Sequence, residues 1–228
     1  MTVKDFLYGL ALKQIKLRTR AGLIQATEFE LQSLLPESRV LSIGGYGTTD
    51  TQLDIICSKL NLQLITLDID ENHMPDILAD IGSSQIFQQS DFSAVIALEV
   101  FEHIQEYERA LENIHKMLVP GGLIIVSTPW IIPVHDKPAD FRRYTHFELA
   151  RIFGKWFTTE VGYRGGYTQS VLVLGLRGLM TGGASGKFIC VLSLCVSFFC
   201  KKPKIIFTEL DKIPDSTIGY FVRGIKTS

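Results

Sequence analysis

Residues 40–50, VLSIGGYGTTD, join an apolar run to three glycines and an acidic residue. The run RVLSIGG (39–45) predicts a buried strand, and TDTQLDIICSKL (49–60) predicts the helix that follows it. A glycine turn between a strand and a helix lets backbone N–H groups approach a ligand closely, beside the positive end of the helix. By itself the stretch does not distinguish such a site from an ordinary loop that contains glycine.

On the C-terminal side of this stretch, short apolar runs alternate with longer amphipathic ones. Strands are predicted at 62–70, 92–100 and 121–129, with a loop from 71 to about 82 and a helix at 106–118 that ends before Pro120-Gly121-Gly122. Alternating strands and helices with nearly continuous apolar strands predict a parallel sheet covered on both faces. The fold class is therefore a doubly wound α/β architecture.

The two ends of the chain follow a different pattern. Residues 1–37 predict an N-terminal helical cap, and 38–228 form the main domain. In its last part we expect a helix from 147, a strand over 158–166 and a final strand over 216–226, with an apolar helical insertion at about 165–204. Because Lys13, Lys16 and Arg18 interrupt the apolar residues of the N-terminus, it does not read as a secretory signal.

The insertion contains the most apolar segment, FICVLSLCVSFFC (188–200), followed by Lys201, Lys202 and Lys204. As a helix, 13 residues span about 20 Å, less than the roughly 30 Å of a hydrocarbon core. A buried helix is favoured, and an interfacial anchor with a basic flank stays open. We expect a cytoplasmic protein, with peripheral contact to the inner face of the membrane as the alternative.

Charge and cysteine content narrow the function classes. The 228 residues carry 23 Lys and Arg against 24 Asp and Glu, a net charge of −1, so no basic surface for nucleic acid is expected. Cys190, Cys195 and Cys200 recur every five residues, which places successive thiols of a helix roughly 140° apart. They do not converge on a metal, so we expect buried thiols, no metal and a reducing compartment.

Asp68, at the end of LITLD, lies 24 residues after Gly44 and is placed to accept both hydroxyls of a ribose. The dinucleotide fingerprint G-x-G-x-x-G fails from Gly44, because Tyr46 and Thr49 occupy its other glycine positions. A P-loop is absent as well. A nucleotide-like ligand other than a nicotinamide dinucleotide is favoured.

Four segments, VLSIGGYG, LITLDID, FSAVIALEVFEHI and MLVPGGLIIVSTP, resemble the successive motifs of class I S-adenosylmethionine-dependent methyltransferases. The resemblance covers about 39–130 and implies a Rossmann-like, mostly parallel seven-stranded sheet with an antiparallel last strand. It makes 38–228 a methyltransferase domain with S-adenosylmethionine as its cofactor. The donor-binding residues that it implies are Gly44, Gly45, Gly47, Asp68, Ile69, Asp80, Ile81 and Leu98. The family usually has an acidic residue at Ser42 and a glycine at Tyr46, so a non-catalytic protein of this fold stays an alternative.

The loop TPWIIPVHDKPADFRRYTHFELARIF (128–153) resembles that of a subgroup associated with polysaccharide or lipid-linked glycan synthesis. The matching positions are His135, Pro138, Asp140, Phe141, Arg142 or Arg143, Tyr144 and Thr145. The resemblance implies a loop at the catalytic end of the sheet that shapes the acceptor site. Trp130, Arg142, Arg143 and Tyr144 are the candidate substrate residues, against the alternatives of ion pairing and packing.

Methyl transfer is an in-line displacement that depends mainly on orientation, and an oxygen acceptor also needs a base. The candidate catalytic residues are His135, Glu99 and His103. His135 is preferred because it lies in a proline-flanked loop without an apolar periodic role. Glu99 and His103 have the alternatives of closing a strand and starting a helix.

These observations predict a methyltransferase that O-methylates a sugar or a lipid-linked glycan intermediate. Its partners would be that small-molecule or lipid-linked substrate and a membrane surface, with no nucleic acid. A quinone or other small hydrophobic acceptor would explain the apolar insertion equally, and that enzyme remains the rival.

Overall fold

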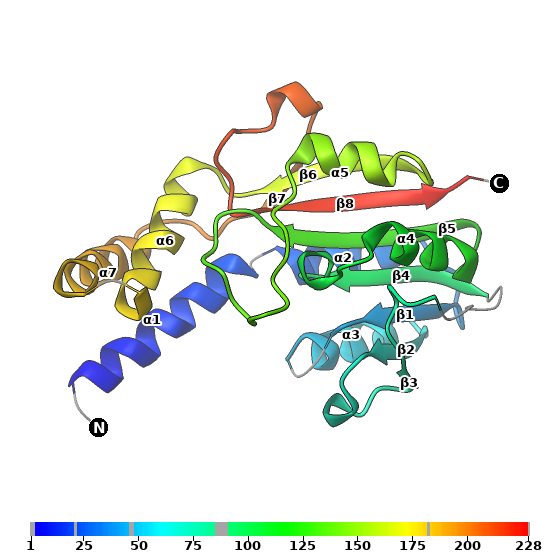
Figure 1. Ribbon diagram of the computed structural model, residues 1–228, viewed down its shortest axis with the longest axis horizontal. Helices are drawn as coiled ribbons and strands as arrows, with labels where there is room; N and C mark the ends of the chain where they lie inside the picture. Colours follow the sequence, from blue (N-terminus) through cyan, green and yellow to red (C-terminus); the bar gives the residue numbers. More distant parts are fainter. Residues whose placement is uncertain (1–2, 21, 46–47, 85–90, 182, 228) are drawn as a thin grey trace.

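A computed structural model describes residues 3–20, 22–45, 48–84, 91–181 and 183–227 (Figure 1). The helices are α1 (Val3–Thr19), α2 (Leu23–Leu31), α3 (Thr48–Lys59), α4 (Tyr107–Met117), α5 (His146–Phe153), α6 (Tyr167–Thr181) and α7 (Ala184–Ser197). The strands are β1 (Arg39–Ile43), β2 (Gln63–Asp68), β3 (Ile77–Leu78), β4 (Phe92–Leu98), β5 (Leu118–Pro129), β6 (Phe157–Arg164), β7 (Ile205–Phe207) and β8 (Gly219–Lys226). Short 3-10 turns lie at Glu71–His73, Phe101–His103 and Leu210–Lys212.

The strands form one sheet in the order β3-β2-β1-β4-β5-β8-β6-β7. Strands β1 to β5 pair in parallel, whereas β8 runs antiparallel to both β5 and β6. The doubly wound fold with an antiparallel last strand is therefore confirmed. The expected count of seven strands was wrong, because β7 adds an eighth strand antiparallel to β6, and β3 falls inside the expected loop.

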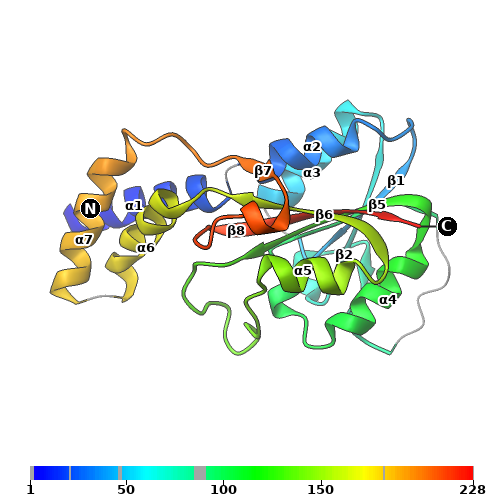
Figure 2. The same ribbon diagram turned by 90° about the horizontal axis from the view of Figure 1, so that it is seen from above.

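Two apolar cores lie on opposite faces of the sheet (Figure 2). Helices α4 and α5 cover one face, where Leu111, Ile114 and Phe153 are buried against the strands. Helices α2 and α3 cover the other, with Leu31 and Leu53 buried. Burying strands on both faces explains why their sequences are almost continuously apolar.

The junction of α4 and β5 differs from the expected boundary. The helix ends at Met117 and β5 begins at Leu118, so Pro120-Gly121-Gly122 lies within the irregular start of the strand. Phe92 pairs with Leu118 and Ala94 with Leu123, which leaves extra residues bulged on β5. Gly121, with φ of 76°, supplies the left-handed conformation that this bulge requires.

Helices α1, α6 and α7 form a separate layer beyond one end of the sheet (Figures 1 and 2). Ile15, Leu176 and Leu194 form its small core. Arg18 of α1 donates hydrogen bonds to Gln169 Oε1 (2.8 Å), to the carbonyl of Ser197 at the end of α7, and to the Cys200 and Lys201 carbonyls that follow it. These bonds satisfy carbonyl groups that a helix C-terminus leaves without partners.

The favoured interpretation of 188–200 as a buried helix was wrong. Phe188, Leu192, Phe198 and Phe199 are exposed, Phe199 at 91%. Within the described part of the chain α7 packs mainly against α6 and α1, and the apolar side chains on its other side are exposed. Within the described residues no helix combines the length and the apolar character that crossing a bilayer requires.

The cysteines give a direct test of this packing. Cys57 and Cys190 are buried, but Cys195 is exposed, so the expectation of buried thiols fails at Cys195. Burial raises the pKa of Cys57 to about 11, which removes the reactive thiolate. We expect a maleimide at neutral pH to label Cys195 within minutes and Cys57 only after denaturation, as read by peptide mass spectrometry. Rapid labelling of Cys57 in the folded protein would contradict this packing; Cys195→Ser serves as the control.

Candidate active site

The turn after β1 is held tightly against the turn after β4. Gly44 has φ of 63°, and its N–H donates to Leu67 O of β2 at 2.8 Å. A Cβ at Gly44 would lie 2.9 Å from both methyl carbons of Val100, so only glycine fits here. Predicted donor residue Gly45 follows directly, whereas Gly47 and Tyr46 lie outside the described residues.

Asp50 of α3 places a carboxylate beside Ser42, the position where the family usually has an acidic residue. Its Oδ1 accepts a hydrogen bond from Ser42 Oγ at 3.2 Å, and a side chain at Gly45 would collide with it. Burial raises the pKa of Asp50, with the nearby Asp68 charge adding to the shift. The acidic group that the family places at position 42 is thus present in space, supplied by a residue from the next helix.

Asp68 lies at the C-terminal end of β2, as the sequence predicts for the ribose-binding residue. Its side chain is 8% exposed; Oδ1 accepts from Asp70 N–H at 2.9 Å, and Oδ2 lies 3.0 Å from His73 Nδ1. Each carboxylate oxygen keeps one further acceptor site, so the residue suits a pair of hydroxyl groups. Together with the glycine turn, this carboxylate fits an adenosyl donor.

The other predicted donor residues have different surroundings. Ile69 is 71% exposed, and Ile81 is buried. Asp80 is exposed, and its Oδ1 accepts the Gly82 N–H at 2.8 Å, while Asn113 Nδ2 donates to Ile81 O at 2.8 Å and holds this loop to α4. Leu98 is half-buried at the end of β4. Their contact with the donor stays a prediction.

Glu99 adopts φ of 59°, a strained conformation for a residue with a side chain. Its N–H donates to Ser127 O at 2.9 Å, and its Oε1 accepts from Ser127 Oγ at 2.9 Å. The same oxygen lies 3.2 Å from Nη2 of Arg164, which is completely buried. The turn after β4 is therefore clamped to β5 and β6, and Oε1 is occupied by structural contacts.

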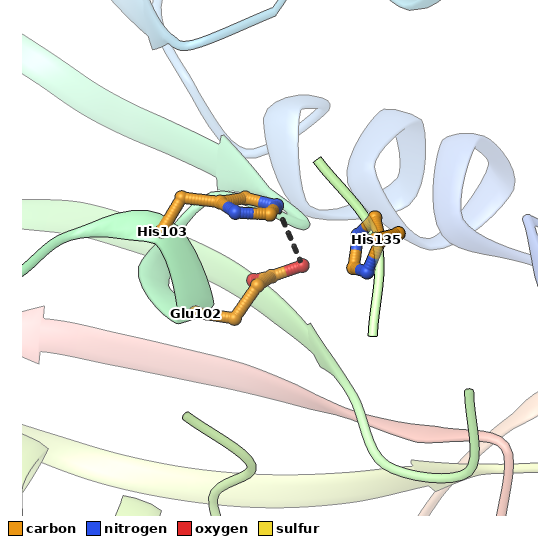
Figure 3. Close-up of side chains that lie close together, drawn as sticks. All are labelled: Glu102, His103 and His135. Carbon is orange, nitrogen blue, oxygen red and sulfur yellow. Dashed lines mark ion pairs between the residues drawn. The ribbon is translucent and has the colours of Figure 1, made fainter. Parts of the chain in front are cut away.

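Glu102, His103 and His135 meet beside this turn (Figure 3). The His103 and His135 rings are 4.9 Å apart in an edge-on arrangement, and Glu102 Oε1 lies 3.7 Å from His103 Nε2. Glu102 is fully buried, and neither oxygen has a hydrogen-bond partner among the described residues. Burial, followed by the Glu99 charge, raises the pKa of Glu102 well above its usual value. The sequence analysis did not select Glu102, although its signal is the run EVFEHI.

The loop after β5 is pinned by Asp140, whose side chain is 1% exposed. Arg143 donates two parallel hydrogen bonds to this carboxylate, at 2.5 and 2.8 Å. His135 approaches Asp140 Oδ2 through its backbone N–H at 2.9 Å and through Nδ1 at 3.1 Å. The Arg143 guanidinium holds the pKa of Asp140 well below its usual range, so the carboxylate is ionised and orients His135.

The four candidate substrate residues are engaged within the protein. Arg142 donates to Ile104 O at 2.6 Å and Gln105 O at 2.9 Å, while Tyr144 is buried with its hydroxyl 3.3 Å from Phe101 O. Trp130 is half-buried, with its ring 6.0 Å from that of Tyr220, and Arg143 is bound to Asp140 as described above. Their geometry favours shaping the loop over contacting an acceptor.

Arg177 of α6, which no sequence pattern singled out, lies near enough to Glu99 and Arg143 for their charges to act on it. Burial lowers its pKa, while the charge of Glu99 raises it and that of Arg143 lowers it. The apolar insertion thus brings a cation within electrostatic reach of the strand ends. No local motif marks it, because α6 is distant in sequence from β4 and β5.

A cavity of about 810 Å³ opens between α1, α2, α3 and the segment before β7. It reaches Leu98 and Glu99 at the end of β4. Its basic lining residues are Lys16, Arg20, Lys202 and Lys204, and its apolar ones include Leu17, Leu23, Phe29, Ile205 and Phe207. This volume is sufficient for a small-molecule ligand.

A doubly wound sheet with a glycine turn after β1, a carboxylate ending β2 and polar groups after β4 defines the class I methyltransferase fold. Residues 16–160 match the family described as methyltransferase domain. The chain belongs to this family, and its fold is the one that S-adenosylmethionine-dependent methyltransferases share. No curated protein matches the chain in sequence.

Solved structures share the fold at low sequence identity. Phosphoethanolamine N-methyltransferase 2 of Haemonchus contortus, in complex with S-adenosyl-L-methionine, matches with TM-score 0.58 and 14% identity over 90% of this chain and 52% of its own. A methyltransferase of Thermotoga maritima gives 0.56 and 13% over 95% of both chains. One from Archaeoglobus fulgidus gives 0.53 and 13%, over 89% of this chain and 94% of its own. The chain spans about half the length of the Haemonchus enzyme.

Proposed function

We propose that this methyltransferase O-methylates an amphiphilic acceptor, a lipid-linked glycan intermediate, at a membrane surface. The observation that carries the proposal is the cavity of about 810 Å³ with both basic and apolar lining residues that ends at Glu99. Lys16, Arg20, Lys202 and Lys204 suit a phosphate group, and the apolar lining residues suit a hydrocarbon chain. The resemblance of the loop 128–153 to glycan-modifying enzymes supports the same acceptor.

The donor supplies an electrophilic methyl group on a sulfonium. The glycine turn, Asp50 and Asp68 would hold it at the ends of β1 and β2, and the cavity, which reaches Leu98 and Glu99 at the end of β4, would bring the acceptor hydroxyl to the same edge of the sheet. This hydroxyl must lose its proton for efficient transfer. His135 stays the preferred base, because the Asp140 carboxylate at its Nδ1 leaves Nε2 able to accept a proton.

The test is transfer of a labelled methyl group to fractionated lipid and sugar extracts. We expect label in a lipid-extractable product that releases a methylated sugar on mild acid hydrolysis, and no label with Asp68→Ala. Label only in quinones would establish the rival enzyme. Label on an amine, as the similarity to a phosphoethanolamine N-methyltransferase allows, would overturn O-methylation. Failure to bind S-adenosylmethionine at millimolar concentration would favour the alternative of a non-catalytic protein that keeps this fold.

The exposed face of α7 is proposed to dock on anionic lipid at the inner face of the membrane. Phe198 and Phe199, at the C-terminal end of α7, are 61% and 91% exposed, Lys201 and Lys202 just after them are exposed, and so is Lys187 in the first turn of the helix. Apolar burial with basic neighbours favours anionic bilayers.

Replacing Phe198 and Phe199 with Ser is expected to weaken binding to phosphatidylglycerol vesicles at least tenfold, since burying each ring contributes about 1.5–3 kcal/mol. Sedimentation with vesicles measures this. Phe147→Ser on α5, also exposed, should leave binding unchanged. Equal binding by neutral vesicles, or equal loss with Phe147→Ser, would contradict the docking surface.

A further inference from the structure

We propose that Glu102, His103 and His135 bind a divalent metal ion through one carboxylate oxygen and two imidazole nitrogens. One ligand atom from each residue lies within 4.8 Å of the others. In Figure 3 the Glu102 carboxylate points toward the His103 ring, and His135 lies opposite both on the loop that follows β5. A bound cation would draw these atoms together by small side-chain movements.

The hydrogen bonds that His103 and His135 make through Nδ1 leave Nε2 of each ring as the metal-binding atom. His103 Nδ1 lies 2.8 Å from Ala139 O, which can only accept, so Nδ1 carries the proton. His135 Nδ1 lies 3.1 Å from Asp140 Oδ2, a carboxylate held ionised by Arg143. Each Nε2 therefore keeps its lone pair, which is the tautomer that a metal requires. A carboxylate or carbonyl behind a histidine is the usual outer partner at metal sites.

Glu102 provides a second observation that favours a cation at this point. Its side chain has no exposure to solvent, and within the described part of the chain neither oxygen accepts a hydrogen bond, while His103 Nε2 lies 3.7 Å from Oε1. Leaving a buried polar group without a partner is costly, and buried carboxylates are ordinarily paired or bound to metal. A cation at this point satisfies the carboxylate.

The ligand set indicates which ion is bound. Two imidazoles and one carboxylate suit a borderline ion such as Zn²⁺ or Mn²⁺, whereas Ca²⁺ prefers an all-oxygen shell. Three protein ligands leave a coordination position open, as in catalytic sites. The run EVFEHI holds Glu102 and His103 side by side, but His135 comes 32 residues after His103, so only the fold brings the three together.

The metal site deepens the proposed function and, for its catalytic role, rests on it. The acceptor hydroxyl would occupy the open position, where coordination lowers its pKa and its proton passes to water. The oxygen then forms a bond to the methyl carbon as the carbon–sulfur bond breaks and its electron pair stays on sulfur. In this scheme His135 acts as a ligand, and the cation replaces it as the group that activates the hydroxyl.

The experiment titrates the chelator-treated full chain with Co²⁺ by visible absorption and with Zn²⁺ by calorimetry, without donor or acceptor. We expect one equivalent to bind and the affinity to fall at least tenfold in His103→Gln, His135→Gln and Glu102→Gln. His115→Gln, a histidine outside the cluster, should bind as the wild type does. Circular dichroism identifies any variant that fails to fold.

No binding of either ion at 1 mM, or equal loss with His115→Gln, would overturn the site. Methyl transfer is measured separately before and after adding metal back. Metal binding without lipid-linked methylation would leave the site intact and reject the proposed acceptor. Methylation by the fully chelated protein at the wild-type rate would reject the catalytic role of the metal.

Discussion

Asp68→Ala is expected to lower the affinity for S-adenosylmethionine by about 100- to 1,000-fold, as measured by calorimetry. Hydrogen bonds to a charged group contribute about 1.5–3 kcal/mol each, and the ribose offers two hydroxyls to this carboxylate. The side chain is 8% exposed, so water cannot easily take its place. Methyl transfer at subsaturating donor should fall in parallel.

A matched control separates this effect from a change of local fold. Glu71→Ala removes an exposed carboxylate three residues away and should leave donor affinity within a factor of two. Asp68→Ala also removes the contacts of this carboxylate with Asp70 N–H and His73 Nδ1, so unchanged near-ultraviolet circular dichroism must accompany the result. Wild-type affinity in Asp68→Ala would show that the donor lies elsewhere.

Asp140→Ala is expected to destabilise the protein by about 3 kcal/mol, because it leaves the partly buried Arg143 without its bidentate partner. For a chain of this size, that corresponds to a decrease in Tm of about 6–12 °C. The His135 backbone and ring both lose their acceptor, so methyl transfer should fall by more than tenfold even below the melting transition.

Thermal denaturation and initial rates at 20 °C together check this prediction. Asp136→Asn in the same loop removes the charge of a carboxylate that is 77% exposed and keeps a residue type that tolerates the φ of 47° at this position, so its effect on stability should stay within about 0.5 kcal/mol. A fall in rate without a fall in Tm would mean that Asp140 contacts the substrate. A fall in Tm with a normal rate would mean that the orientation of His135 is irrelevant to catalysis.

Local sequence patterns were sufficient for the sheet and for part of the site. The apolar runs at 39–45 and 92–100 contain β1 and β4, because strands buried on both faces must be apolar throughout. Gly44 and Asp68 follow from their positions at strand ends, since parallel strands bring their carboxyl ends to one edge of the sheet. The short β7 was not predicted, because three residues carry too little periodicity.

For α7, composition alone could not predict which side chains are buried. Its composition predicts burial, yet burial depends on how many neighbours reach it, and α1 and α6 cover only part of its surface. Likewise, Arg142 and Arg143 are adjacent and chemically identical. In the structure Arg142 donates to a carbonyl of the turn that follows β4, whereas Arg143 donates to Asp140.

The succession of the longer strands along the chain, the glycine turn and the acidic end of β2 were determined by the sequence itself, because each depends on residues close together in the chain. Tertiary structure alone decided that Asp50 stands beside Ser42, that Arg177 reaches the strand ends and that Glu102 and His103 meet His135. Those groups come from separate elements. Only the packing of helices and loops over the sheet sets the distances between them.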